Sequence, residues 1–390
     1  MNEHPSTRRV AAGESRHDHR GPDQCAADHR GPDHRERLVN TRDVGDDEAA
    51  GVGREPPAGR TRTRLLALLL AAAALVLSVA LSIMVGSTHV PLSSVLGAFG
   101  GHDGSPEHIA VRDLRVPRTA LGLLVGASLA VSGALMQGLT RNPLADPGLL
   151  GVNAGAGFAV ALSVAFLGVT RVDQYLYFAF AGAVAATAAV YLIASQGRGS
   201  PTPLRLTLVG LALGSVLVGL AQTLALLDTE TFERVRFWDV GTLADRPVGT
   251  VGAVTPWICA GLLLALACAR PLNALSLGDE LARAVGVRVG LTRLGVVLAV
   301  TLLCGSATAA AGPLAFVGLM VGHAVRWLTG PDYRWVLPMC LLVGPALVLS
   351  ADVLGRVMVG SGELQVGVVV ALLGAPMLIV MVHLRRASAL

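Results

Sequence analysis

The chain alternates between long apolar stretches and short polar segments over most of its length. The first uninterrupted apolar run covers residues 65–84. About 20 helical residues cross the ~30 Å hydrocarbon core of a bilayer. A secretory signal core is shorter and lies closer to the start of a chain. We therefore interpret this run as the first membrane-spanning helix.

Further apolar stretches of similar length follow. The uncharged block 294–325 is too long for one helix and carries Pro313 near its middle, where proline removes a backbone donor, so we divide it into two spans. The pattern predicts an all-α, polytopic membrane protein with ten transmembrane helices and both termini on one side. After the first run, the predicted spans are 116–139, 150–170, 175–196, 206–227, 251–269, 292–310, 313–328, 335–355 and 364–384.

Arginine in the connecting segments predicts the orientation. If both termini lie inside, the inner segments hold 14 arginines and the outer segments hold 8. Because cytoplasmic loops carry the excess of basic residues, we expect both termini in the cytoplasm.

Residues 1–62 differ from the rest in composition. Residues 1–64 hold 12 arginines and 12 acidic residues, and the segment 1–62 lacks apolar runs, so it cannot bury enough surface to order itself. We predict a disordered cytoplasmic tail at 1–62 and one ten-helix membrane domain at 63–390. Histidines in the tail could hold a metal ion weakly, although the composition favours plain disorder; they are His17, His19, His29 and His34.

The overall composition excludes several classes of function. The chain is 53% hydrophobic and 15% charged, and its net charge of +4 is too weak and scattered for a nucleic-acid surface. All 31 basic residues are arginine, so there is no P-loop lysine, and any ATP-driven activity needs a separate ATPase. Scattered cysteines argue against a disulfide framework. We expect no cofactor and no metal site in the spans.

Two groups of charged residues border the predicted spans on the outer side. Arg115 and Arg118 open the second span, where the helix dipole disfavours cations, so a function or lipid phosphates must offset the cost. Asp352 and Arg356 lie four residues apart near the outer end of the ninth span, a spacing typical of a helical ion pair.

The longest inner loop, 275–293, predicts a short amphipathic helix. Asp279 and Glu280 fall in its first turn, and Gly286 is a natural stop. Acidic residues at its start make it a poor anchor for anionic lipid, so we favour docking into the groove of a partner protein.

Ionisable residues are scarce inside the spans, where His323 is the one histidine well within a predicted helix. Ion-coupled secondary transporters place such groups at mid-membrane. A secondary transporter driven by an ion gradient is one alternative for the function of this chain. The scarcity favours a wide uncharged path for a bulky solute whose charge is already masked.

Several motifs together resemble the FecCD-type permeases of the iron-chelate and cobalamin ABC importers. The resemblance covers about residues 65–386. The motifs are RVPR at 115–118, GASLAVSGALMQGLTRNPLADPGLLGVNAGAG at 126–157, LGDELARAVGV at 277–287, GPLAFVGLMVGHAVR at 312–326, ADVLGR at 351–356 and GVVVALLGAPMLIVM at 367–381.

The resemblance implies a type II ABC importer permease with a cobalamin-permease-like fold, in a bacterial cell membrane. Such a subunit pairs with itself or with a sister permease. Two cytoplasmic ATPases drive it, and an extracytoplasmic solute-binding lipoprotein delivers the cargo. The expected cargo is a ferric siderophore, with cobalamin and haem as alternatives. The permease itself catalyses no bond change.

The resemblance also assigns roles to residues. Docking of the binding protein would use Arg115, Arg118 and Arg356. The coupling helix held by the ATPase would include Gly278, Asp279, Glu280, Ala282 and Gly286. Cytoplasmic gates would include Asn142, Pro143, Leu144, Thr202, Pro203 and Leu204.

Two positions depart from the family pattern. Gly322 and Gln365 stand where the family usually has proline, which predicts looser bends in the eighth and tenth spans. A regulatory membrane protein that has lost transport is a third interpretation.

Overall fold

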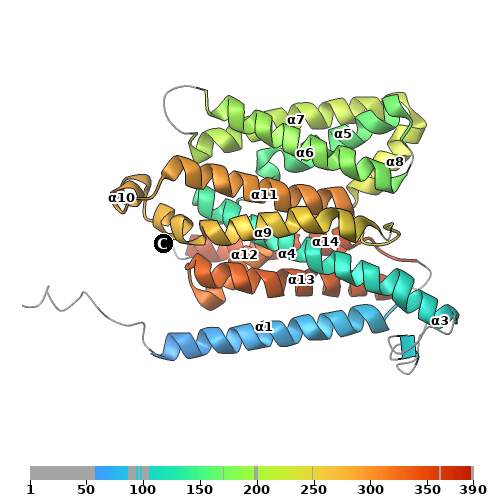
Figure 1. The fold of residues 1–390 in the computed structure, drawn as a ribbon, viewed down its shortest axis with the longest axis horizontal. Helices are drawn as coiled ribbons and strands as arrows, with labels where there is room; N and C mark the ends of the chain where they lie inside the picture. Colours follow the sequence, from blue (N-terminus) through green and yellow to red (C-terminus); the bar gives the residue numbers. More distant parts are fainter. Residues whose placement is uncertain are drawn as a thin grey trace, which may run out of the picture. The chain divides into compact units, whose positions relative to one another are not determined.

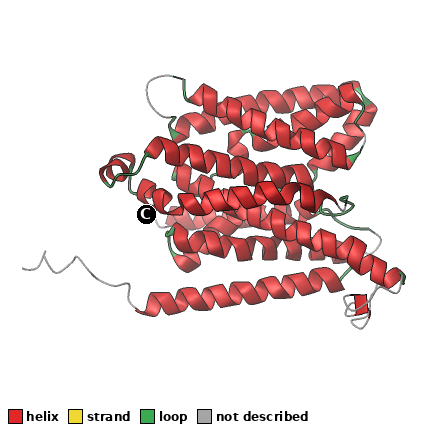
Figure 2. Cartoon of the chain, viewed as in Figure 1, coloured by secondary structure: helices red, strands yellow, loops and turns green. Residues whose placement is uncertain are grey.

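The computed structural model describes residues 58–86, 94, 97–98, 105–169, 171–196, 201–247, 249–359 and 362–387. Within these residues the chain is helical and contains no strand (Figure 2). The predicted tail therefore lies outside the described residues up to residue 57, and so do its histidines. The first helix begins at Ala58, a few residues before the predicted boundary.

The predicted spans correspond to ten helices of the described chain. Seven meet the length and hydropathy of a membrane span, α5 and α14 are shorter apolar helices, and α12 has 13 residues. The all-α polytopic architecture is confirmed. These helices are α1 (Ala58–Met84), α4 (Val116–Thr140), α5 (Val152–Leu167), α6 (Val172–Ala194), α7 (Pro203–Leu227), α9 (Gly249–Ser276), α11 (Val289–Ala311), α12 (Val317–Thr329), α13 (Tyr333–Met358) and α14 (Val366–Ala387).

The helices run side by side, and they differ in how deeply they are buried (Figure 1). The most apolar window of the continuous helix that includes α4 is 83% buried, and that of α11 is 78% buried. The corresponding window of α1 is 11% buried. Helices α4 and α11 therefore form the centre of the bundle, and α1 lies on its periphery.

Glycines let α4 approach its neighbours closely. A Cβ atom on Gly126 would lie 2.5 Å from the Cα of Pro345 in α13. A Cβ on Gly133 would overlap the backbone of Gly318 in α12. Small residues allow this kind of backbone contact between membrane helices. These glycines give α4 close-packing faces toward α12 and α13.

Four elements at the ends of the bundle were not predicted. The second span begins ten residues early, because α3 (Pro106–Ile109) and the π-helix η2 (Ala110–Arg115) continue into α4. A polar helix, α8 (Thr229–Asp239), follows α7. A 3-10 turn, η3 (Pro147–Leu150), precedes α5.

The long uncharged block divides near Pro313, as predicted, but α12 begins four residues later than expected. Gly312 and Phe316 both have positive φ, at 82° and 67°, and the link between them is not helical. This link packs against the segment after α8, where the amide of Thr242 donates to the carbonyl of Ala311 at 2.7 Å.

The structure explains why glycine suits position 322. Helix α12 runs unbroken through Gly322, and a Cβ there would lie 2.7 Å from Oε1 of Gln137. The Gln137 amide donates back to the carbonyls of Gly318 and Leu319, each at 3.4 Å. The missing side chain thus makes room for a buried amide of α4. Helix α14 begins directly after Gln365, whose carbonyl accepts from the amide of Val368.

Candidate functional sites at the two ends of the bundle

The predicted loop helix is α10 (Asp279–Ala284), which lies at the left-hand end of the bundle in Figure 1, here named the α10 end. Gly278 and Gly286 border it with φ of 121° and 83°. Its last turn closes through bonds from the amide of Gly286 to the carbonyl of Arg283 and from Val287 to Ala282, both 2.9 Å. These left-handed positions favour glycine, so the predicted stop at Gly286 is confirmed.

One face of α10 presents an apolar row to the outside. Leu277, Leu281 and Val285 are 69%, 59% and 68% exposed. Leu281 and Val285, four positions apart, share one side of α10 and its C-terminal cap, and Leu277 lies just before the helix. Ala282 is fully buried and anchors the other side. An exposed apolar row on a helix that begins with acidic residues fits the groove of a partner protein.

The predicted gate residues lie in two turns. Arg141 ends α4 with φ of 51°, and Asn142 Oδ1 then accepts from the amide of Leu144 at 3.0 Å, a side-chain turn that Pro143 stiffens. Thr202 caps α7 by accepting from the amide of Arg205 at 3.4 Å. Pro203 occupies the first helical turn, where its missing amide proton costs nothing.

Asp279 joins these turns to α10. Its Oδ1 accepts from Arg141 Nη2 at 2.7 Å, and its Oδ2 accepts from Arg293 Nη2 at 2.6 Å. Arg293 also donates through Nη1 to the carbonyl of Pro201 at 3.1 Å. Burial by itself raises the pKa of the Asp279 carboxyl, but the guanidinium of Arg293, together with that of Arg141, outweighs it and the pKa lies below its ordinary value.

At the opposite end, here named the α8 end because it carries α8, two of the predicted docking arginines cap α1. Arg115 Nη1 donates to the carbonyls of Ile83 and Met84 at 2.9 and 2.8 Å. Arg356 Nη1 donates to the carbonyls of Ser82 and Val85, each at 2.8 Å. The last carbonyls of a helix lack partners and carry the negative end of its dipole, so two cations stabilise them.

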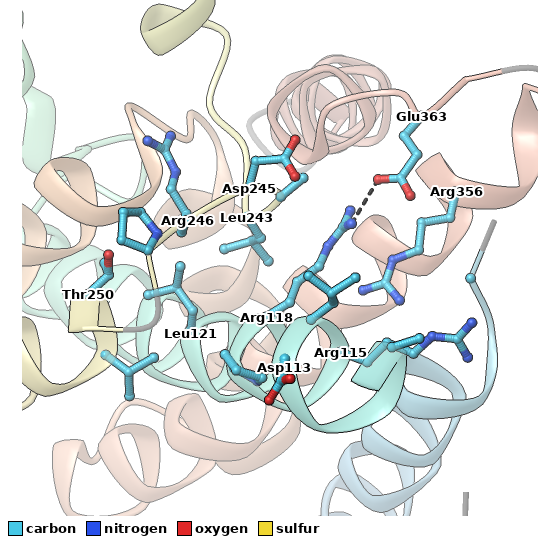
Figure 3. Close-up of a pocket in the computed structure, with 17 residues that line it drawn as sticks. Asp113, Arg115, Arg118, Leu121, Leu243, Asp245, Arg246, Thr250, Arg356 and Glu363 are labelled. Carbon is cyan, nitrogen blue, oxygen red and sulfur yellow. Dashed lines mark hydrogen bonds and ion pairs between the residues drawn. The ribbon is translucent and has the colours of Figure 1, made fainter. Parts of the chain in front are cut away.

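Arg118 occupies the more open side of the same cluster. It contacts Asp352 at 2.8 Å and Glu363 at 2.7 Å, and Asp352 also forms the predicted pair with Arg356. Figure 3 shows Arg118 reaching Glu363 beside a cavity of about 280 Å³ that Asp245 and Arg246 also line. The predicted pair of Asp352 and Arg356 is therefore part of a network that connects α4, α13 and the segment before α14.

Exposure separates the three arginines. The side chain of Arg118 is 15% exposed, whereas that of Arg356 is 2% exposed and Arg115 as a whole residue is 6% exposed. The cap on α1 offsets the cost of placing cations at the start of α4, so this cost alone does not require a docking partner. Sequence reasoning missed the cap because its acceptors are backbone carbonyls, which no motif records.

The fold and its two ends define a class: a multi-pass helical membrane protein with an exposed apolar helix at one end and a charged cluster at the other. The model of the FecCD transport family matches residues 74–384. The chain belongs to this family of transport permeases.

Relatives and a solved structure agree with this assignment. The chain is 51% identical over 310 residues to the ferric enterobactin transport system permease protein FepD of Escherichia coli (strain K12), covering 79% of this chain and 92% of the relative. It is 39% identical over 317 residues to the Fe(3+)-citrate import system permease protein YfmD of Bacillus subtilis (strain 168), covering 81% and 94%. A structure described as an inward-facing conformation of an ABC transporter of the metal-chelate type superposes with a TM-score of 0.71 at 28% identity, covering 82% and 99%.

Proposed function

We propose that the chain is the membrane-spanning permease subunit of an ABC importer that carries a ferric siderophore into a bacterial cell. The observation that carries the proposal is its 51% identity, over 310 residues, to a ferric enterobactin permease. The chain would supply the translocation path and two docking faces, and it would catalyse no bond change.

The α10 end would face the cytoplasm and two ATPase subunits. The exposed row of Leu277, Leu281 and Val285 supports this role, because such a row in water is stabilised when a partner covers it. The chain has no lysine, so the phosphate-binding lysine of a P-loop must come from another chain. Both termini would then lie on the cytoplasmic side.

The α8 end would receive the extracytoplasmic binding protein. Among the three predicted docking arginines, Arg118 is the one whose exposure suits direct contact with an acidic side chain of the receptor. Arg115 and Arg356 would act by holding α1 and α13 in place around it. In this division of roles Arg118 contacts the receptor, and Arg115 and Arg356 are buried because they support it from within the bundle.

The path would run between two copies of this chain or between it and a sister permease. Helix α7 supports this arrangement, because it is long and mostly apolar and only 22% of its most apolar window is buried within one copy. Lipid would cover part of that surface and a second permease the rest. The turns at 142–144 and 202–204 would form the cytoplasmic gate of this path.

Whole-cell uptake tests the proposal. Deleting the gene from its bacterium and growing the cells without iron should abolish uptake of radioactive ferric siderophore, and a plasmid copy should restore it. Uptake should persist when ionophores collapse the ion gradients while cellular ATP is maintained. Uptake that stops when the ion gradients collapse and does not depend on ATP would assign the chain to secondary transport instead.

A further inference from the structure

The predicted coupling helix and the two predicted gate turns meet at one carboxylate. Arg141 directly precedes the turn at 142–144, and Pro201 directly precedes the turn at 202–204. Asp279 reaches the first turn through Arg141 and the second through Arg293, whose other nitrogen binds the carbonyl of Pro201. We name these four residues the Asp279 junction. The contact of Asp279 with Arg141 spans 138 positions and that of Arg293 with Pro201 spans 92, so only the folded chain brings these residues together.

The junction is firmly held on the bundle side. The side chain of Arg293 is 4% exposed, whereas that of Arg141 is 44% exposed but is held by a second bond, from its Nε to the carbonyl of Leu275 at 3.0 Å. Charge-assisted hydrogen bonds of 2.6 to 2.7 Å are stronger and more directional than neutral ones. A small displacement of the Asp279 carboxylate therefore has to move or break both guanidinium contacts.

The backbone segments that join α10 to its neighbours are more flexible than the side-chain contacts of the Asp279 junction. Gly278 and Gly286 border the helix in left-handed conformations, and a Cβ on either would have no heavy atom within 4 Å. Glycine joints in open surroundings let a short helix tilt at little cost. The backbone alone is thus a soft link between α10 and its neighbours, and the side chains of the junction supply the stiff link.

We propose that Asp279 is a positioning residue that transmits movement of α10 to both gate turns, so that the two turns change together. The proposal rests on the proposed function, because it assumes that an ATPase moves α10. It assigns the charged first turn of α10 a mechanical role inside the permease, in addition to any contact with the ATPase.

The test uses the assembled complex of permease, ATPase and binding protein in liposomes, and it measures the ratio of ferric siderophore imported to ATP hydrolysed. The test variant is Asp279→Asn, which keeps the shape and removes the charge. The expected result is an import ratio lowered about tenfold, the order expected when positioned bonds to a charged group are lost, whether or not the rate of ATP hydrolysis also changes. Asp279→Glu should restore most of the ratio.

A matched control is Asp173→Asn. Asp173 also forms an ion pair through both carboxylate oxygens, with Arg171, but both side chains are exposed at the α8 end. Its neutralisation should leave the import ratio unchanged. An unchanged ratio in Asp279→Asn, or a ratio that Asp279→Glu fails to raise, would overturn the proposal.

A second variant covers the case in which Asp279→Asn fails to assemble. Arg141→Gln removes one arm of the junction and leaves the pair of Asp279 and Arg293 in place, so the import ratio should fall while assembly is kept. An unchanged ratio in this variant also overturns the proposal. Failure of the proposed function is distinguishable, because then the unaltered complex would show no ATP-dependent import at all.

Discussion

At the scale of single residues, two buried arginines end the first helix. The carbonyls of residues 82 to 85 all accept hydrogen bonds from Arg115 or Arg356. Helix α1 is the least buried of the candidate spans, so few apolar contacts within the chain hold it. The four hydrogen bonds from Arg115 and Arg356 to its C-terminal end, here named the clasp, therefore help to attach α1 to the bundle.

Replacing Arg115 by alanine should loosen this clasp. Removing hydrogen bonds to a charged group costs about 2 kcal/mol. We expect the melting temperature of the detergent-solubilised protein to fall clearly. The matched control is Arg112→Ala, since Arg112 is exposed in the same π-helix. Equal melting temperatures for the two variants would show that the clasp contributes nothing.

Arg118 gives a prediction about the receptor. Arg118→Gln keeps a polar side chain but removes the charge that we expect an acidic receptor residue to meet. The binding protein should then stimulate ATP hydrolysis by the complex at least about tenfold less, while the rate without it stays the same. Arg171→Gln, an exposed arginine at the same end, serves as the control. Full stimulation in Arg118→Gln would remove the docking role.

At the scale of elements, glycine determines how the central helix packs. Helix α4 lies against α13 at Gly126 and Gly344 and against α12 at Gly133 and Gly318, with backbone touching backbone. No flexible side-chain end is available at these crossings to move aside. The helices must separate if either crossing gains a methyl group.

Gly126→Ala should therefore destabilise the bundle by about 2 kcal/mol through overpacking. Gly252→Ala in α9 is the matched control, because a Cβ there meets nothing within 4 Å and alanine has the higher helix propensity. In detergent, the melting temperature of the first variant should fall, and that of the second should stay the same or rise slightly. A tolerated Gly126→Ala would mean that α4 and α13 lie farther apart than the structure has them.

The exposed row on α10 gives a second prediction at this scale. Leu281→Glu places a charge in the centre of the row, and burying it in a partner groove without a counter-charge is costly. The ATPase should no longer co-purify with the permease, whereas Leu281→Met should retain it. Retention of the ATPase by the glutamate variant would separate α10 from ATPase binding.

The sequence predicted well the helices that have to cross the membrane. All the predicted spans became helices, because a helix in lipid needs a long apolar run and few alternatives satisfy its backbone. Pro313 marked the division of the long block correctly. Helix α8 and the π-helix before α4 were missed, because they lie at the polar end of the bundle, where hydropathy carries little information.

The same limit applies to the sites. The acidic start and glycine stop of α10 could be predicted from local sequence, and the structure has the helix at Asp279–Ala284. Its contact with Arg141 could not be predicted, since 138 positions separate the two residues and only the fold brings them together. The hydrogen bonds that cap the end of α1 could not be predicted for the same reason.

At the scale of the whole molecule, we infer a permease that a separate ATPase drives. One end carries a charged cluster that suits a receptor, and the other carries an exposed helix linked to the turns at 142–144 and 202–204. Between them, the apolar helices provide the path. Membership of the FecCD transport family fits this arrangement.

ATP-driven import by the purified complex tests this claim most directly. Permease, ATPase and binding protein are reconstituted in liposomes, with ATP supplied on the ATPase side and ferric siderophore with its binding protein on the other. We predict accumulation that requires ATP, stops with a hydrolysis-deficient ATPase, and continues when ionophores remove every ion gradient. Accumulation without ATP, driven by an imposed proton or sodium gradient, would contradict the account.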